Sequence, residues 1–522
     1  LHCFSTYQDQ FLSMFPNFIK ESPELTNVRA QRYGCFGFDI VPGEREQYDL
    51  FCKEMEESGF IRYTRCDNLK DIFFNTTYFK DDYVVMISHI TVHHKIWVYG
   101  YPKTLHTSIS AMEAFANVPV MKHMKPARHY GADNFVNVAC NVDMQDYKDY
   151  LCDLEKVGFL KYVVNEEGLG GTVFSATYTK DEKVVTVTHF AKTRKATISV
   201  YPNLPLSNHL LKQDLRDIKH NAQTKLHMLK LSYMGNSFVI QLKNGHFIIN
   251  DGGTWDDTEH LLEYMESLVP EGEKPIVEAW VLSHAHSDHV GALYSIPDIE
   301  GRAERICVEG VYFSEPNDDV IALFPVCAAE VIYTKEAIKE LRTSEGDATP
   351  IYRPQTGQRY YFDDVTMDIV HSQEHLTIEE YSGDINDSST WVMFTIEGQK
   401  CLFCGDGESG SQKAVRYHYD EAYLKLDVFT LPHHGHHTRD EFTDYIEVKT
   451  VLATVKEQVP AHRMAQNERL KEKANEWLVW GDGTKVLAFP YKVGTYEVQE
   501  YHLPIYHEIC MQIEERLFGK TK

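Results

Sequence analysis

The sequence predicts an α+β protein with two domains. Residues 48–102 recur about 100 positions later, and each copy has a helical segment followed by strands. Further along the chain, apolar strands run directly into loops rich in histidine and aspartate. The length of 522 residues also exceeds the roughly 100 to 200 residues of an ordinary domain. We therefore expect an α+β domain with an internal duplication over residues 1–221 and a second domain over residues 222–522.

The two copies match in apolar spacing and in register. Residues 48–60 align with residues 147–159, and both segments have helical periodicity and end in Gly-Phe. His89 and His189 are separated by 100 positions, and we expect both to be strand residues. Each copy predicts a β-α-β-β-β unit. The predicted repeats extend over about 33–102 and 132–202.

The role of this repeat domain stays open. Two such units could pair their sheets about a pseudo-twofold axis and bind a ligand between them. A scaffold or dimerisation module fits the same pattern. Residues 203–222 are expected to form a helical linker to the second domain.

The net charge of -25 belongs almost entirely to the second domain. Residues 1–221 contain 25 of the 52 basic and 27 of the 77 acidic residues, which leaves 27 basic and 50 acidic residues, a net charge of -23, for residues 222–522. Such a field repels polyanions. We therefore expect a small-molecule or phosphoester substrate as the partner, and no long nucleic acid.

No stretch approaches the roughly 18 uninterrupted apolar residues of a membrane-spanning helix. The eleven cysteines are odd in number and irregularly spaced, which is typical of reduced thiols. We expect a cytoplasmic protein without membrane insertion, and we leave its oligomeric state open. Because the sequence begins at Leu1, a removed leader is also compatible with it.

The strongest chemical signal directly follows the apolar run at 276–282. His284 and His286 lie two residues apart at the end of this expected strand, so their side chains point the same way. Asp288 and His289 fall on the turn that opens a helix. Four side chains that can bind metal therefore converge within a few residues.

This motif resembles that of the metallo-β-lactamase-fold superfamily of metal-dependent hydrolases, over roughly residues 225–500. Members are αββα sandwiches with the metals at one edge of the paired sheets, so the resemblance implies that fold here. Asp251 ends a hairpin similar to the family's opening hairpin. Asp406 ends a short apolar strand, like the aspartate that bridges the metals in the family.

A second histidine loop, at 433–437, follows another apolar strand. Its His-His-Gly start and the segment 386–389, which reads Asn-Asp-Ser-Ser, resemble the branch that contains ComEC-type DNA-internalisation proteins and phosphorylcholine esterases. That branch and its relatives usually supply a third histidine to the first metal from the loop before the Gly-Asp strand, and this chain has none there. The substitutes that we consider, besides water, are His371, His375, Asp384 and Asn386.

The resemblance implies two divalent metal ions that share one carboxylate. Imidazoles and carboxylates suit Zn, Mn or Fe, with Zn the first expectation, and a hydroxide held between the ions would be the nucleophile. We expect Asp288 to contribute to catalysis as well as to metal binding. The first ion is assigned His284 and His286, the second ion is assigned Asp288, His289 and His434, and the bridge is assigned Asp406.

His433 is then available as a catalytic residue that protonates the leaving group. The reverse assignment, with His433 as the ligand and His434 as the helper, stays open. Weaker candidates at the rim of the site are His436, His437 and His462. The thiols of Cys401 and Cys404 lie in an expected strand and are predicted to be packed rather than reactive.

These observations predict a binuclear metal-dependent hydrolase, and the histidine loop favours a phosphoester or phosphodiester substrate. Two alternatives remain. The protein could hydrolyse a small-molecule ester, lactone or β-lactam, or it could be a non-catalytic partner-binding protein on the same scaffold. The intact histidine and aspartate motifs argue against the second alternative.

Overall fold

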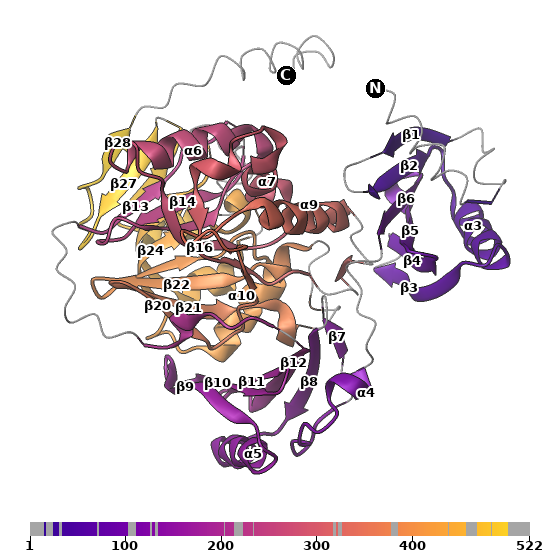
Figure 1. The fold of residues 1–522 in the computed structure, drawn as a ribbon, viewed down its shortest axis with the longest axis horizontal. Coiled ribbons are helices and arrows are strands. Elements are labelled where there is room, and N and C mark those ends of the chain that lie inside the picture. Colours follow the sequence, from indigo (N-terminus) through magenta and orange to yellow (C-terminus); the bar gives the residue numbers. More distant parts are fainter. Residues whose placement is uncertain are drawn as a thin grey trace, which may run out of the picture. The chain divides into compact units, whose positions relative to one another are not determined.

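The computed structural model of the chain is drawn in Figure 1. It describes residues 15–16, 25–30, 34–69, 73–102, 111–125, 128–130, 134–202, 204–212, 223–232, 234–316, 320–321, 326–376, 380, 385–436, 438–455, 467–481 and 483–499. The chain forms two compact units. The first unit contains residues 1–110, 129–133 and 316–333, and the second contains residues 111–128, 134–315 and 334–522.

The first unit contains an antiparallel six-stranded sheet, called sheet I, with the strand order β1-β2-β6-β5-β4-β3. One helix, α3, buries Tyr48, Phe51 and Met55 in the core of this unit. The elements are β1 (Leu25–Ala30), β2 (Phe36–Ile40), α3 (Arg45–Glu57), β3 (Ile61–Leu69), β4 (Phe73–Lys80), β5 (Tyr83–Ile90) and β6 (Lys95–Pro102).

The second unit contains a sheet with the equivalent order β8-β12-β11-β10-β9, called sheet II. Its helix α5 begins at a capping box, in which the Asp143 carboxylate accepts hydrogen bonds from the backbone N–H groups of Gln145 and Asp146. The elements are β8 (Asn134–Cys140), α5 (Met144–Lys156), β9 (Leu160–Leu169), β10 (Val173–Lys180), β11 (Lys183–Phe190) and β12 (Lys195–Pro202), preceded in the chain by α4 (Ala111–Ala114) and β7 (Arg128–Tyr130).

The predicted β-α-β-β-β unit is one strand short. Strands β3 and β9 follow the helices directly, so each copy runs β-α-β-β-β-β. The first eight residues of β9 are exposed or half-buried, which removes the apolar alternation that marks a strand in the sequence. The duplication itself stays a prediction.

Two further sheets form the rest of the second unit. Sheet III has the order β19-β18-β16-β15-β14-β13-β27-β28, with β17 beside β16, and sheet IV has the order β20-β21-β22-β23-β24-β25-β26. The strands of sheet III are β13 (Lys225–Met228), β14 (Ser237–Gln241), β15 (Phe247–Asp251), β16 (Ile276–Leu282), β17 (Cys307–Val308), β18 (Val311–Phe313), β19 (Ile351–Tyr352), β27 (Thr484–Ala488) and β28 (Glu497–Gln499). Those of sheet IV are β20 (Arg359–Phe362), β21 (Val365–His371), β22 (Trp391–Ile396), β23 (Gln399–Phe403), β24 (Lys425–Thr430), β25 (Glu447–Ala453) and β26 (Glu476–Val479).

Sheets III and IV pack against each other and carry helices on their outer sides (Figure 1). Phe238 of β14 contacts Phe403 of β23 edge to face, with ring centroids 4.9 Å apart, so aromatic side chains fill the space between the sheets. Helix α10 packs against β21. The helices of this unit are α6 (Thr258–Ser267), α7 (Ser287–Tyr294), α10 (Ser409–His418), α11 (Asp440–Tyr445) and α13 (Glu468–Lys473), and the residues of α9 (Val326–Glu340) are divided between the two units.

Sheet II shares a hydrophobic core with sheet IV and its helices. Leu169, Val173 and Phe190 belong to the same buried cluster as residues of β22 to β25. The hydroxyl groups of Ser175 and Thr188 also donate hydrogen bonds to backbone carbonyls of the loop at 356–357. The second copy is therefore grouped with the residues that follow it, and the predicted domain boundary after residue 221 stays a prediction.

Replacing Phe190 with alanine is expected to lower the free energy of unfolding by about 3 to 5 kcal/mol, because the ring is fully buried and leaves a cavity. Its ring stacks on His418 of α10, with centroids 4.0 Å apart. Urea denaturation measures the change. The control is Leu160→Ala, on a side chain that is 71% exposed, with an expected change within about 0.5 kcal/mol. Equal effects of the two variants would contradict the shared core.

The predicted helical linker falls largely outside the described residues. Of this segment, residues 204–212 are described, and they contain a short 3-10 turn at Asn208–Leu210. Within the described ranges, no helix is long and apolar enough to cross a membrane.

Candidate metal centre

The candidate site lies where strands of sheets III and IV end. His284 follows β16, Asp406 follows β23, and His433 and His434 follow β24. β16 runs parallel to β15, and β23 runs parallel to β24, so the carboxyl ends of each pair lie at one edge of their sheet. The Thr390 N–H donates a hydrogen bond to the Ser283 carbonyl oxygen at 2.8 Å and joins the two edges.

Asp251 organises the first histidine motif from the end of β15. Its carboxylate accepts hydrogen bonds from the N–H and the hydroxyl of Ser283, at 2.7 and 2.9 Å, and lies 2.8 Å from Nδ1 of His289. All three side chains are buried. Burial alone would lower the pKa of His289, but Asp406, Asp251 and Asp288 outweigh it and raise this pKa well above its usual range. A metal at Nε2 would displace the proton there, while Nδ1–H donates to the Asp251 carboxylate.

One group of possible ligands contains His284, His286 and Asp406, with ligand atoms within 4.8 Å of one another. Nε2 of His284 lies 2.9 Å from Nδ1 of His286 and 4.0 Å from an oxygen of Asp406. Burial, and after it the neighbouring imidazoles, lowers the pKa of His284 well below its usual range. His284 is therefore neutral, which is the form that binds metal.

The second group contains Asp288, His289, Asp406 and His434. Nε2 of His289 lies 3.0 Å from one oxygen of Asp406, and Nε2 of His434 lies 3.4 Å from the other oxygen and 3.1 Å from Asp288. Nδ1 of His434 lies 3.0 Å from the hydroxyl of Thr454. Ligand atoms at about 2.1 Å from a tetrahedral ion would be about 3.4 Å apart, close to these separations.

Charge in the second group favours a cation. Burial alone would lower the pKa of His434, but Asp406 and Asp288 outweigh it and raise this pKa to about 9. Burial would raise the pKa of Asp406, but the surrounding imidazoles outweigh it and hold this pKa well below its usual range. The carboxylates are thus ionised and stabilise positive charge beside them, which a divalent ion can supply as well as a proton.

One buried pair of atoms supports the fit of a metal. Nε2 of His289 and Oδ1 of Asp406 face each other at 3.0 Å as an ion pair, and neither atom has a further partner among the described residues. An ion bound by both atoms would take the place of the proton that they share, and the nitrogen and oxygen donors suit Zn, Mn or Fe.

His433 lies beside the second group and is held by a carboxylate. Its Nδ1 is 2.9 Å from Glu408, and its Nε2 is 3.8 Å from Asp406. The Asn386 side-chain amide donates to the same Glu408 oxygen at 3.0 Å and lies 3.4 Å from Nδ1 of His433. Nε2 of His433 therefore faces the site, and its side chain remains 22% exposed.

Two backbone features fix the distances in the site. His433, His434 and Gly435 have φ values of 46°, 50° and 83°, in the left-handed region that costs non-glycine residues energy. At Gly405, an added Cβ would lie 2.6 Å from the Cβ of Ser283. A glycine is required here because the chain before Asp406 touches the chain before His284.

The residues that were considered as substitutes for a third histidine ligand lie at different places in the structure. Nε2 of His371 lies 3.4 Å from the Asp387 carbonyl oxygen, and the ring of His375 packs on Phe190. Neither belongs to the ligand groups found among the described residues, and burial lowers the pKa of His371 to about 4. Asn386 does lie at the site, next to His433. Asp384 lies outside the described residues.

Of the weaker candidate residues at the rim of the site, only His436 is described by the structure. The His436 ring lies 4.9 Å from that of His433, at the rim of the site. His437 and His462 lie outside the described residues. The thiols of Cys401 and Cys404 are fully buried, and burial raises the pKa of both well above the usual range. They are packed side chains.

Three residues that support the site could not be recognised from the sequence. Glu408 orients His433, and Thr454 contacts His434. Asp387 accepts hydrogen bonds from the N–H groups of Glu408 and Ser411, and so anchors the start of α10. Single acidic or hydroxyl residues without a motif carry no signal in one sequence. Asp387 alone lay in a segment that the sequence had singled out.

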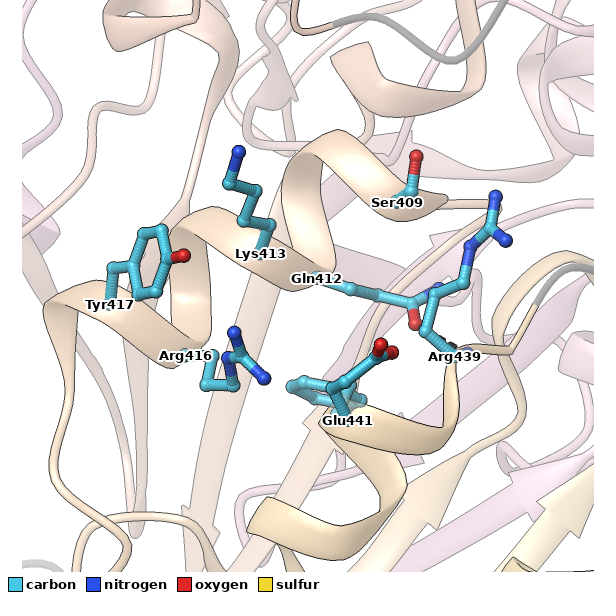
Figure 2. A pocket seen from close by; sticks show the side chains of 8 residues that line it. Ser409, Gln412, Lys413, Arg416, Tyr417, Arg439 and Glu441 are labelled. Atoms are coloured by element: carbon cyan, nitrogen blue, oxygen red, sulfur yellow. Dashed lines mark hydrogen bonds between the residues drawn. The ribbon is translucent and has the colours of Figure 1, made fainter.

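A cationic pocket of about 320 Å³ lies along α10, which begins three residues after Asp406 (Figure 2). Figure 2 shows Lys413 and Arg416 on α10 and Arg439 and Glu441 across from them. Gln412 joins the walls, since it accepts a hydrogen bond from the Arg439 N–H and donates one to the Gly407 carbonyl oxygen. Among the described residues, none of the three cations forms an ion pair. The pocket is lined by Ser409, Gln412, Lys413, Arg416, Tyr417, Arg439, Glu441 and Phe442.

Residues 233–443 match the model of the metallo-beta-lactamase superfamily. This range includes both ligand groups. No curated protein matches the chain. The chain therefore contains a domain of a superfamily that is largely hydrolytic and metal-dependent, and this domain together with the His/Asp cluster suggests a metal-dependent hydrolase.

Proposed function

We propose that the protein is a binuclear metallohydrolase that cleaves a phosphoester or phosphodiester bond in a small substrate, and that its domain belongs to the ComEC-like and phosphorylcholine esterase branch. Two ligand groups that share Asp406 support two metal ions. Bound there, the ions would lower the pKa of a water molecule and polarise a phosphoryl oxygen. His284, His286, Asp288, His289, Asp406 and His434 would hold them.

The chain's own contribution to bond cleavage is assigned to His433 and Glu408. Glu408 accepts the Nδ1 proton of His433 and fixes the ring, so that Nε2 faces the site. From Nε2, a proton would pass to the leaving oxygen of the substrate. Asn386 donates to Glu408 and keeps this carboxylate in place.

The observation that carries the substrate class is the cationic pocket of Figure 2. In a chain with a net charge of -25, Lys413, Arg416 and Arg439 gather without ion-pair partners among the described residues. Ser409, at its wall, is three residues from Asp406. A negatively charged substrate group would pair with these cations, whereas a neutral lactone or ester gains little from them.

The deciding assay compares bis(p-nitrophenyl) phosphate, p-nitrophenyl acetate and dihydrocoumarin as substrates, with Zn and with Mn. We expect the highest kcat/KM for the phosphodiester. A higher kcat/KM for the ester or the lactone with both metals would favour the alternative hydrolase. No turnover of any substrate by metal-loaded protein would favour the non-catalytic scaffold.

The double variant Lys413→Gln/Arg416→Gln is expected to lower kcat/KM for the phosphodiester about 10-fold and to leave the ester rate unchanged, because a charge-assisted contact is lost. The difference should shrink at high salt. Steady-state kinetics at two ionic strengths measure it. The control is Lys425→Gln, which removes an exposed lysine paired with Glu447. Equal losses for both substrates would contradict a role in binding negative charge.

A further inference from the structure

A second pocket lies far from the metal ligands in the sequence, between α5 and strands β9 and β10. Its volume is about 700 Å³, within the range that holds small organic ligands. In Figure 1, α5 lies across these strands of sheet II. The lining residues are Met144, Tyr147, Lys148, Leu151, Cys152, Glu155, Lys161, Val164, Asn165, Glu166, Phe174 and Tyr178.

One residue that lines this pocket, Tyr147, has a buried hydroxyl without a partner among the described residues. Tyr147 is 3% exposed, and its hydroxyl has no hydrogen bond among the residues that the structure describes. The ring stacks on His189, with centroids 5.3 Å apart, so the hydroxyl cannot easily swing to solvent. Burial, and after it Tyr178, raises the pKa of Tyr147. The hydroxyl stays protonated and is ready to donate a hydrogen bond.

Sheet I has the equivalent tyrosine with its hydroxyl satisfied. The ring centroids of Tyr48 on α3 and His89 are 6.1 Å apart, and those of Tyr147 and His189 are 5.3 Å apart. The Tyr48 hydroxyl is 2.8 Å from the hydroxyl of Thr76 on β4. The first copy of the unit thus provides an internal partner for this buried group.

The strand registers identify what has changed in sheet II. Thr76 pairs with Ile87, and Ala176 pairs with Val187 at the same place in the second sheet. An alanine at position 176 cannot bond the hydroxyl of Tyr147. The partner of the tyrosine is therefore missing by substitution and not by a shift of the backbone.

A second sequence difference between the two copies leaves the ring of Tyr147 without the arginine that covers Tyr48. In the first copy, the Arg45 guanidinium lies 3.7 Å from the centroid of Phe74 and 5.4 Å from that of Tyr48, which covers both rings. Met144, the first residue of α5, stands at the equivalent position in the second copy and lines the pocket with Phe174. The arginine cover is absent there.

The lining indicates the chemistry of a ligand. Three aromatic rings and several aliphatic side chains suit a flat apolar body. Two lysines and two glutamates balance in charge, and Glu155 already accepts a hydrogen bond from the Tyr178 hydroxyl at 3.1 Å. The unpartnered Tyr147 hydroxyl calls for an acceptor.

We propose that this pocket binds a neutral aromatic molecule whose carbonyl oxygen accepts a hydrogen bond from Tyr147. The site is separate from the metallohydrolase chemistry, since none of its residues belongs to either ligand group. Its ligand would be bound without being cleaved.

The test uses 6-propionyl-2-(dimethylamino)naphthalene, a neutral naphthyl ketone whose emission reports polarity and hydrogen bonding, with the full-length protein. We expect saturable 1:1 binding with a blue shift of the emission. Tyr147→Phe should raise Kd about 3- to 10-fold, the effect of one lost hydrogen bond. Ala176→Thr should weaken binding similarly, because it gives Tyr147 the internal partner that Tyr48 has. Met144→Arg should abolish binding by covering the rings.

Two controls keep the result specific. Tyr48→Phe, the matched change in sheet I, should leave Kd unchanged. The naphthylamine that lacks the ketone should bind wild type and Tyr147→Phe equally. Failure of the wild-type protein to bind the ketone would overturn the proposal. Binding that survives Met144→Arg would also overturn it. Wild-type affinity in Tyr147→Phe would do the same, and this variant is the more reliable test because it changes only one hydroxyl group and is expected to fold normally.

Discussion

Replacing Asp406 with alanine is expected to remove metal from both ligand groups and to lower turnover by at least about 10³-fold, because several kcal/mol of electrostatic stabilisation is lost. One oxygen of Asp406 lies 3.0 Å from His289, and the other lies 3.4 Å from His434 and 4.0 Å from His284. The carboxylate belongs to both groups. Metal analysis of the purified variant, together with phosphodiester kinetics, measures both effects.

Asp288→Ala is the matched comparison, because Asp288 belongs to only one group. It should lower metal content by at most one ion per chain. Asp444→Asn removes a carboxylate that is 60% exposed, and should change nothing. Loss of a single ion from Asp406→Ala would contradict the shared carboxylate, and near-stoichiometric metal would remove Asp406 from the site.

Alanine substitutions of the adjacent residues His433 and His434 are expected to affect metal content and turnover differently. His434 is fully buried between Thr454 and the carboxylates, so His434→Ala should lower metal content and turnover together. His433 contacts Glu408, so His433→Ala should keep metal near the wild-type level and lower turnover by about 10²- to 10⁴-fold. Metal analysis and kinetics on the same preparations separate the two.

Comparing substrates with different leaving groups tests the role of His433 more directly. If His433 donates a proton, its loss should matter much less for nitrophenolate, which leaves without one, than for an alkoxide. Glu408→Gln should reproduce this pattern at smaller amplitude, because Glu408 only positions the ring. Since both histidines have left-handed φ values, His433→Asn and His434→Asn test whether backbone strain causes the effects. Equal metal loss from both alanine variants would contradict the division of roles.

Strands that are buried on both faces were the most predictable part of the fold. The apolar run at 276–282 coincides with β16, and its seven residues are buried or half-buried. By contrast, β3 and β9 were missed, because a largely solvent-exposed strand such as β9 has no apolar pattern to detect. The packing of Phe190 on His418 could not be predicted either, since no sequence pattern records which sheet a buried strand meets.

The candidate site was easiest to locate where side chains that can bind metal are crowded into short motifs. The segment from His284 to His289 indicated four of the side chains that the structure brings together, and the Gly-Asp strand indicated Asp406. His371 was a poor candidate for a ligand, because its ring contacts His375 and Trp391 in the protein interior. Side-chain direction at a bulged strand end depends on the register between β21 and β22, which is irregular between Ile369 and His371.

The contact at Gly405 has a consequence for the spacing of the candidate ligands. The hydrogen of Gly405 faces the side chain of Ser283, where a Cβ would come within 2.6 Å of the Ser283 Cβ. The backbone before Asp406 therefore packs directly on the residue before His284, and this contact helps to set the distance between the two candidate ligands. A larger residue at position 405 is expected to push the two segments apart and to lengthen this distance, although no candidate ligand is replaced.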